Sequence, residues 1–217
     1  MAKKIHKSRH QIKDFRIALK DLEPMVKELK YLHNGRDISN FSLRPREAWA
    51  NWLLCVVFRE LHDDDITFAE DKEGDGIIID KLTGQQIRTE HVSALDIPKG
   101  KKLPKGEQRV IDAINLKIRK GAEYAKDKFL VVFFDGAGLF YRNKIREAVR
   151  GKHNFIAIYC IGLLDSEEDV YTYAITELSD THSITFRIEI NEDFTDWQIK
   201  QLNYYRLKAD RFPSMST

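Results

Sequence analysis

Two acidic residues, Asp75 and Glu90, have the residue type and the spacing to share a divalent cation. Residues 81–84 between them predict a tight turn, because the glycine at the end of this segment can take a positive φ at little cost. A hairpin through this turn pairs Asp80 with about Gln85, and counting back then places the two acids roughly opposite each other. Facing carboxylates on paired strands repel, and a cation that prefers oxygen ligands would offset that repulsion. The alternative is a register shifted by one residue, which leaves both acids at solvated strand ends.

Length and composition allow one domain with a full core, because the chain has 217 residues of which 42% are hydrophobic. No apolar run approaches the ~20 residues that a membrane span needs, and residues 1–7 lack the apolar segment of a secretory signal. Cys55 and Cys160 both lie within apolar segments, which fits two buried thiols in a reducing compartment better than a disulfide framework. We therefore expect a cytoplasmic protein.

The charges are distributed unevenly, although the net charge of +2 gives no overall signature of nucleic-acid binding. Residues 1–16 and 98–106 are rich in basic side chains, whereas residues 63–75 are rich in acidic ones. Basic segments that flank an acidic pocket suit an enzyme that binds phosphates and holds a cation, and solvated loops are the alternative explanation. The residues of the second basic segment that we expect to contact phosphates are Lys99, Lys101, Lys102 and Lys105.

Hydrophobic periodicity predicts an α/β sandwich with a mixed central sheet. Residues 1–40 form an N-terminal helical arm, and residues 41–217 form one α/β domain. The first elements expected in that domain are a helix at 44–61, strands at about 66–70, 76–80 and 86–92, a helix at 107–126 and a strand at 129–134. The later ones are a helix at 139–150, a strand at 155–161, and a C-terminal β-β-α extension at 170–178, 183–190 and 197–202.

This order resembles the αβββαβ core of the PD-(D/E)xK nuclease superfamily, the restriction-endonuclease-like fold. Asp75, followed here by Gly-Ile-Ile, matches the first motif Asp, and Glu90 matches the acidic residue of the (D/E)xK motif. Glu47 matches the helical Glu of many members, and Glu60, at the far end of the same helix, is the fallback. The resemblance covers about residues 44–162. It implies an enzyme that hydrolyses nucleic-acid phosphodiesters, with DNA as the expected partner and a homodimer as one option for its assembly.

The same resemblance implies a site for Mg²⁺ or Mn²⁺ that is formed by Asp75, Glu90 and Glu47, with a main-chain carbonyl near His91 as a further ligand. A metal there would polarise a phosphoryl oxygen and lower the pKa of the attacking water. The motif lysine would orient that water or stabilise the developing negative charge.

The motif lysine is missing from its expected place, because position 92 is Val92. His91 is no substitute, since neighbouring residues of a strand point to opposite faces. Either the lysine function has moved elsewhere, or this chain has lost catalysis and acts as a module that binds DNA or a protein partner.

Lys117 is the candidate for the moved lysine. It lies in the middle of the helical stripe that should pack on the sheet, the stripe of Val110, Ile114, Gly121 and Tyr124. A lysine is almost never fully buried without a partner, so the carboxylates of Asp75 and Glu90 would pair with its ammonium. The alternative is that its methylene stem lies along the core while its charged end reaches water.

Three weaker patterns have simpler explanations. Residues 135–138, Asp-Gly-Ala-Gly, could form a nucleotide loop, but a plain turn of small residues explains them. Residues 62–65 could bind a metal, or they could form a polar loop at a helix end. Residues 204–206, Tyr-Tyr-Arg, could stack on bases or pack as part of a helix.

Overall fold

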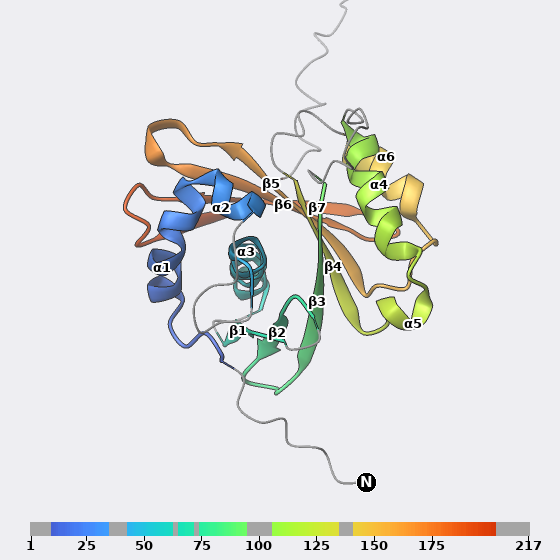
Figure 1. Ribbon diagram of the computed structural model, residues 1–217, viewed down its shortest axis with the longest axis horizontal. Coiled ribbons are helices and arrows are strands. Elements are labelled where there is room, and N and C mark those ends of the chain that lie inside the picture. Colours follow the sequence, from blue (N-terminus) through green and yellow to red (C-terminus); the bar gives the residue numbers. More distant parts are fainter. Residues whose placement is uncertain are drawn as a thin grey trace, which may run out of the picture.

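One eight-stranded mixed sheet organises the protein (Figure 1). The computed structural model describes residues 10–34, 43–62, 65–71, 74–94, 106–134 and 141–202. The strands are β1 (Ile66–Ala69), β2 (Ile77–Asp80), β3 (Gln86–Ser93), β4 (Lys128–Phe134), β5 (Ala157–Asp165), β6 (Tyr171–Leu178), β7 (Ser183–Ile190) and β8 (Trp197–Leu202), and they lie in the sheet in this order. β3, β4 and β5 run parallel to one another, and every other neighbouring pair is antiparallel.

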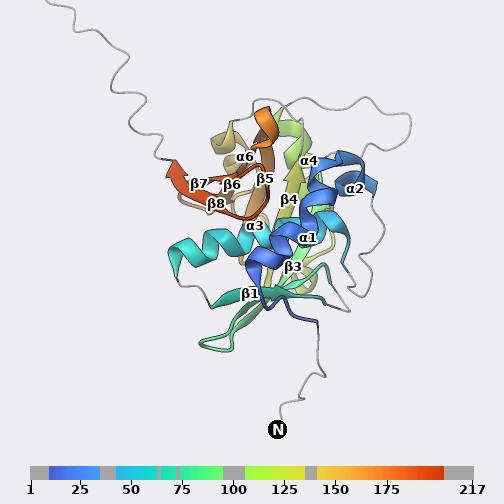
Figure 2. The same cartoon turned by 90° about the vertical axis from the view of Figure 1, so that its left-hand side faces the viewer.

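Helices cover both faces of this sheet. They are α1 (Phe15–Lys27), α2 (Leu29–Asn34), α3 (Pro45–Leu61), α4 (Glu107–Ile118), α5 (Ala122–Ala125) and α6 (Arg142–Val149), with a 3₁₀ turn at Glu167–Asp169. Figures 1 and 2 show α1, α2 and α3 on one side of the sheet and α4, α5 and α6 on the other. The α/β class predicted from the sequence is therefore present, and so are the three strands expected between residues 66 and 92.

The two faces of the sheet have separate hydrophobic cores. Along β4 the side chains alternate between them, so that Val131 belongs to the core under α3 while Leu130 and Val132 belong to the core under α4. This alternation explains why the β4 sequence is a continuous apolar run, because each residue meets a helix on one face or the other.

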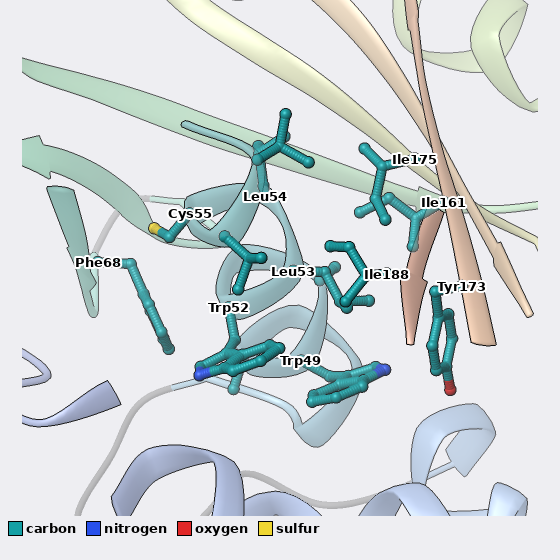
Figure 3. Close-up of a cluster of buried hydrophobic side chains, with 14 of the residues drawn as sticks. Trp49, Trp52, Leu53, Leu54, Cys55, Phe68, Ile161, Tyr173, Ile175 and Ile188 are labelled. Carbon is teal, nitrogen blue, oxygen red and sulfur yellow. The ribbon is translucent and has the colours of Figure 1, made fainter. Parts of the chain in front are cut away.

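The core under α3 contains the largest buried side chains (Figure 3). α3 is buried around most of its circumference, as its apolar sequence requires. Trp49 and Trp52 stack with their ring centroids 5.2 Å apart, and the indole N–H of Trp52 donates to the main-chain carbonyl of Phe15 at 3.0 Å. That hydrogen bond ties α1 to α3.

Two predicted elements were wrong. Residues 197–202 form β8, an edge strand paired with β7, and not an amphipathic helix. Trp197 and Ile199 are two residues apart and more buried than the residues between and beside them, which is the period of a strand. The single helix expected at 107–126 is divided, because Gly121 has φ 94° and separates α4 from α5. Among the described residues, no helix combines the length and the apolar character required to cross a membrane.

Candidate functional site

The hairpin of β2 and β3 has the register predicted from the turn. Ile77 pairs with Arg88, and Asp80 N–H donates to the carbonyl of Gln85 at 3.0 Å. Counting on in this register would place Asp75 across from Glu90, but the regular ladder ends at the pair of Ile77 and Arg88. Beyond that pair two residues bond Thr89, because the N–H of Thr89 donates to the carbonyl of Gly76 at 2.9 Å while the N–H of Asp75 donates to the carbonyl of Thr89 at 3.3 Å.

The carboxylate of Asp75 is fixed against β3. Its Oδ2 accepts a hydrogen bond from the main-chain N–H of His91 at 2.7 Å. This bond holds the side chain of Asp75 beside the strand that carries Glu90, and it leaves the other carboxylate oxygen for a different partner.

Lys117 meets Glu90 from α4. Its Nζ forms an ion pair with Oε1 of Glu90, and the two side chains are only 15% and 10% exposed. Lys117 and Asp75 form no ion pair in the part of the chain that the structure describes, so the predicted contact with two carboxylates is made with one of them. Val92, at the position of the motif lysine, is buried in the core under α4.

Glu47 lies in the first turn of α3 and is 8% exposed. Its Oε2 accepts a hydrogen bond from the main-chain N–H of Arg44 at 3.0 Å, which caps the helix. Burial raises the pKa of Glu47, and the negative charge of Asp75 raises it further, so the two acids are close enough to repel. Glu60, the fallback, is exposed at the other end of α3.

These carboxylates do not form a coordination shell as they stand. No three His, Cys, Asp or Glu side chains within the described ranges are grouped so that they could hold a metal ion. The structure therefore brings Asp75 and Glu90 to the same end of the hairpin, and Glu47 lies close to Asp75. Lys117 contacts Glu90. One carboxylate oxygen of Asp75 and one of Glu47 accept hydrogen bonds from main-chain N–H groups.

Asn51 is a residue of this site that the sequence did not indicate. It is fully buried one turn after Glu47, and its side-chain N–H donates to the carbonyl of Asp75 at 3.0 Å. Its Oδ1 lies 3.2 Å from Nε2 of His91, and since Oδ1 can only accept, Nε2 carries the proton. Burial, followed by the positive charge of Arg46, lowers the pKa of His91 to about 3, so this ring is neutral at neutral pH.

Gly76 is required next to Asn51. It has φ +135°, and a Cβ added there would lie 2.3 Å from the side-chain nitrogen of Asn51. The sequence Asp75-Gly76 therefore allows the hairpin to approach α3 closely enough for the hydrogen bond to Asp75.

Tyr124 is the second residue that was missed, because its place in a helical stripe suggested packing alone. It lies on α5, near the carboxylate of Glu90. Burial, followed by the negative charge of Glu90, raises the pKa of Tyr124. The hydroxyl of Tyr124 accepts a hydrogen bond from Lys120 at 2.9 Å.

Several predicted site residues lie outside the described ranges. They are Lys99, Lys101, Lys102 and Lys105, together with residues 135–138 and 204–206. Of the 62–65 segment, only His62 and Asp65 are described, and both are exposed at the end of α3 and before β1.

Comparison with known proteins adds no assignment to this geometry: no family model, curated protein or solved structure matches the chain.

Proposed function

We propose that this protein is a metal-dependent nuclease of the PD-(D/E)xK type that hydrolyses DNA phosphodiesters. The observation that carries the proposal is the contact between Lys117 and Glu90 at the end of the hairpin that also holds Asp75. Lys117 on α4, Glu90 on β3 and Asp75 just before β2 are the kinds of group that this chemistry needs.

The order of elements supports the same proposal. From α3 onward the chain runs α3, β1, β2, β3, α4, and after the short α5 it continues with β4. β1, β2 and β3 form an antiparallel meander, and β4 then joins β3 in parallel. An αβββαβ core with this pairing would be the restriction-endonuclease-like core, with α1 and α2 before it and further strands after it.

The donor set fits a hard cation. Asp75, Glu90 and Glu47 offer oxygen ligands. Burial, and then the negative charge of Asp75, raise the pKa of Glu47, and a divalent cation would offset the repulsion between these two acids. Mg²⁺ or Mn²⁺ held by these three carboxylates would supply Lewis-acid polarisation of a phosphoryl oxygen and a more acidic water.

The protein groups have separate roles in this proposal. Lys117 would donate hydrogen bonds to the attacking water or to a phosphoryl oxygen on which charge develops, from a largely buried position where such a contact is strong. Glu90 holds the ammonium of Lys117 in place, and Asn51 holds the main chain of Asp75.

A plasmid-nicking assay with Mg²⁺ or Mn²⁺ tests the function. Wild-type protein should convert supercoiled DNA to nicked DNA, EDTA should stop the reaction, and Asp75→Asn should remove it. Asp112→Asn is the matched control, because Asp112 is an exposed acid on α4 that bonds only Gln108 among the described residues. No cleavage with either metal, or equal cleavage by Asp75→Asn, would contradict the proposal.

The alternative is a nuclease-like module that binds DNA or a protein without turnover. The observation that favours it is the apolar burial of Val92 together with the engagement of Glu90 by Lys117. Shifted DNA bands without nicking under any of these conditions would support the alternative.

A further inference from the structure

Two lysines lie against Tyr124, beside the proposed site. Lys120 follows α4 and Lys128 begins β4, and their Nζ atoms lie 4.3 and 4.2 Å from the centroid of the Tyr124 ring. Lys120 Nζ also donates to the Tyr124 hydroxyl at 2.9 Å. The two ammonium groups therefore lie against the same aromatic ring, and that ring lies near Glu90.

This arrangement concentrates positive charge. Within the described ranges, neither Lys120 nor Lys128 forms an ion pair, whereas Lys117 is paired with Glu90 and Arg88 with Asp71. Attraction to the ring is worth only about 0.5–1 kcal/mol at exposed sites, and it does not remove the mutual repulsion of two cations. A bound anion would offset that repulsion.

Basic side chains also predominate in the local sequence. Residues 117–128 contain five basic side chains and two acidic ones, Glu123 and Asp127. Both acids are exposed, and neither pairs with these lysines among the described residues. Glu123 and Asp127 therefore do not neutralise the charges of Lys120 and Lys128.

Lys120 and Lys128 lie close to a carboxylate of the proposed catalytic site. The Tyr124 hydroxyl accepts a hydrogen bond from Lys120 and lies near Glu90, which Lys117 contacts directly. An anion held at Lys120 and Lys128 would lie one side chain away from the carboxylate that we place at the metal.

We propose that Lys120 and Lys128 bind a backbone phosphate of the nucleic acid next to the phosphate that is cleaved. Tyr124 lies next to both this phosphate subsite and Glu90. The inference rests on the proposed nuclease function, since it assigns the position of the substrate's phosphodiester backbone at the same site. It places that backbone along the α4–α5 side of β3 and β4.

The salt dependence of DNA binding tests this subsite. Binding of a short duplex is measured over a range of salt concentrations in an Asp75→Asn background, where cleavage is removed. The double replacement of Lys120 and Lys128 by Gln should lower the slope of log K against log salt by about 0.9, the value for one lost phosphate contact on duplex DNA. Lys120→Gln, a change of an exposed side chain, is the second variant and should lower the affinity in the same direction.

Lys200→Gln is the matched control, because Lys200 is an exposed lysine on the edge strand β8. Its replacement changes the net charge by the same amount as Lys120→Gln and should leave the slope unchanged. In the cleavage assay, the double variant should raise KM more than it lowers kcat. A merely structural role of the two lysines would alter thermal unfolding and leave the slope as it is.

The outcomes separate the two proposals. If the Asp75→Asn protein binds DNA with a salt-dependent affinity and the double variant keeps the full slope, the subsite is overturned and the nuclease proposal stands. If that protein does not bind DNA and wild type does not cleave it, the proposed function fails and the subsite fails with it.

Discussion

The side-chain N–H of Asn51 donates to the main-chain carbonyl of Asp75 at 3.0 Å, across the gap between α3 and the β2–β3 hairpin. Asn51 also contacts His91, whose own main-chain N–H binds the carboxylate of Asp75. Glu47 lies one turn earlier on the same helix. One fully buried amide thus connects the helix that carries one acid to the hairpin that carries the other two.

Replacement of Asn51 by Ala should lower both stability and activity. It leaves the Nε2–H group of His91 buried without its partner, at a cost of about 1–3 kcal/mol in the free energy of unfolding. It also frees the main chain of Asp75. Urea unfolding and the nicking assay measure the two effects. Asn191→Ala is the control, because Asn191 makes its hydrogen bonds in the exposed turn before β8, so its loss should affect stability alone.

Gly76→Ala should be much more destabilising than Gly84→Ala. Both glycines have positive φ, so both replacements introduce backbone strain of about 1–3 kcal/mol. Only at Gly76 does the new Cβ meet the buried side chain of Asn51, whereas Gly84 has nothing within 4 Å. Equal unfolding midpoints for the two variants would show that α3 and the hairpin are not held as closely as the structure has them.

Lys117→Met should reduce cleavage by about 10²-fold or more, as expected when one donor to a developing charge is removed. Lys144→Met is its control, since Lys144 pairs with Glu107 at the surface and is 61% exposed. Cleavage by Lys117→Met at the wild-type rate would mean that Lys117 does not replace the motif lysine.

The ion pair of Lys117 and Glu90 should also show a coupling energy in unfolding experiments. Lys117→Met leaves the carboxylate of Glu90 largely buried without its cation, which costs about 3 kcal/mol. Glu90→Gln combined with Lys117→Met removes the uncompensated charge, so the double variant should be more stable than the single Lys117→Met variant. Strict additivity of the two changes would indicate that the two side chains do not interact.

The titration of His153 should make the fold less stable in mild acid. Burial lowers the pKa of His153 below its ordinary value of 6.5, against the opposing charge of Asp180. The unfolded chain then takes up a proton at a higher pH than the folded chain, so stability falls as the pH drops below about 6.5. Chemical denaturation of His153→Gln should show a smaller loss of stability than wild type between about pH 7.5 and about pH 5. Parallel pH profiles would contradict this assignment.

The sequence determined the hairpin, because turn geometry and the two-residue period of strands act between near neighbours. Residues 81–84 and the pairing of Asp80 with Gln85 were sufficient to predict the register of β2 and β3 as far as the pair of Ile77 and Arg88. Helical periodicity likewise placed Lys117 on the face of α4 that packs on the sheet. The same local reasoning failed at 197–202, where pairing with β7 makes the segment a strand.

Only the tertiary structure decided which side chains meet at the hairpin. Glu90 and His91 are adjacent in sequence, yet they face opposite sides of β3, so α4 brings Lys117 to one and α3 brings Asn51 to the other. Those partners are 27 and 40 positions away along the chain. Such contacts depend on how each helix packs against its face of the sheet, which no short stretch of sequence specifies.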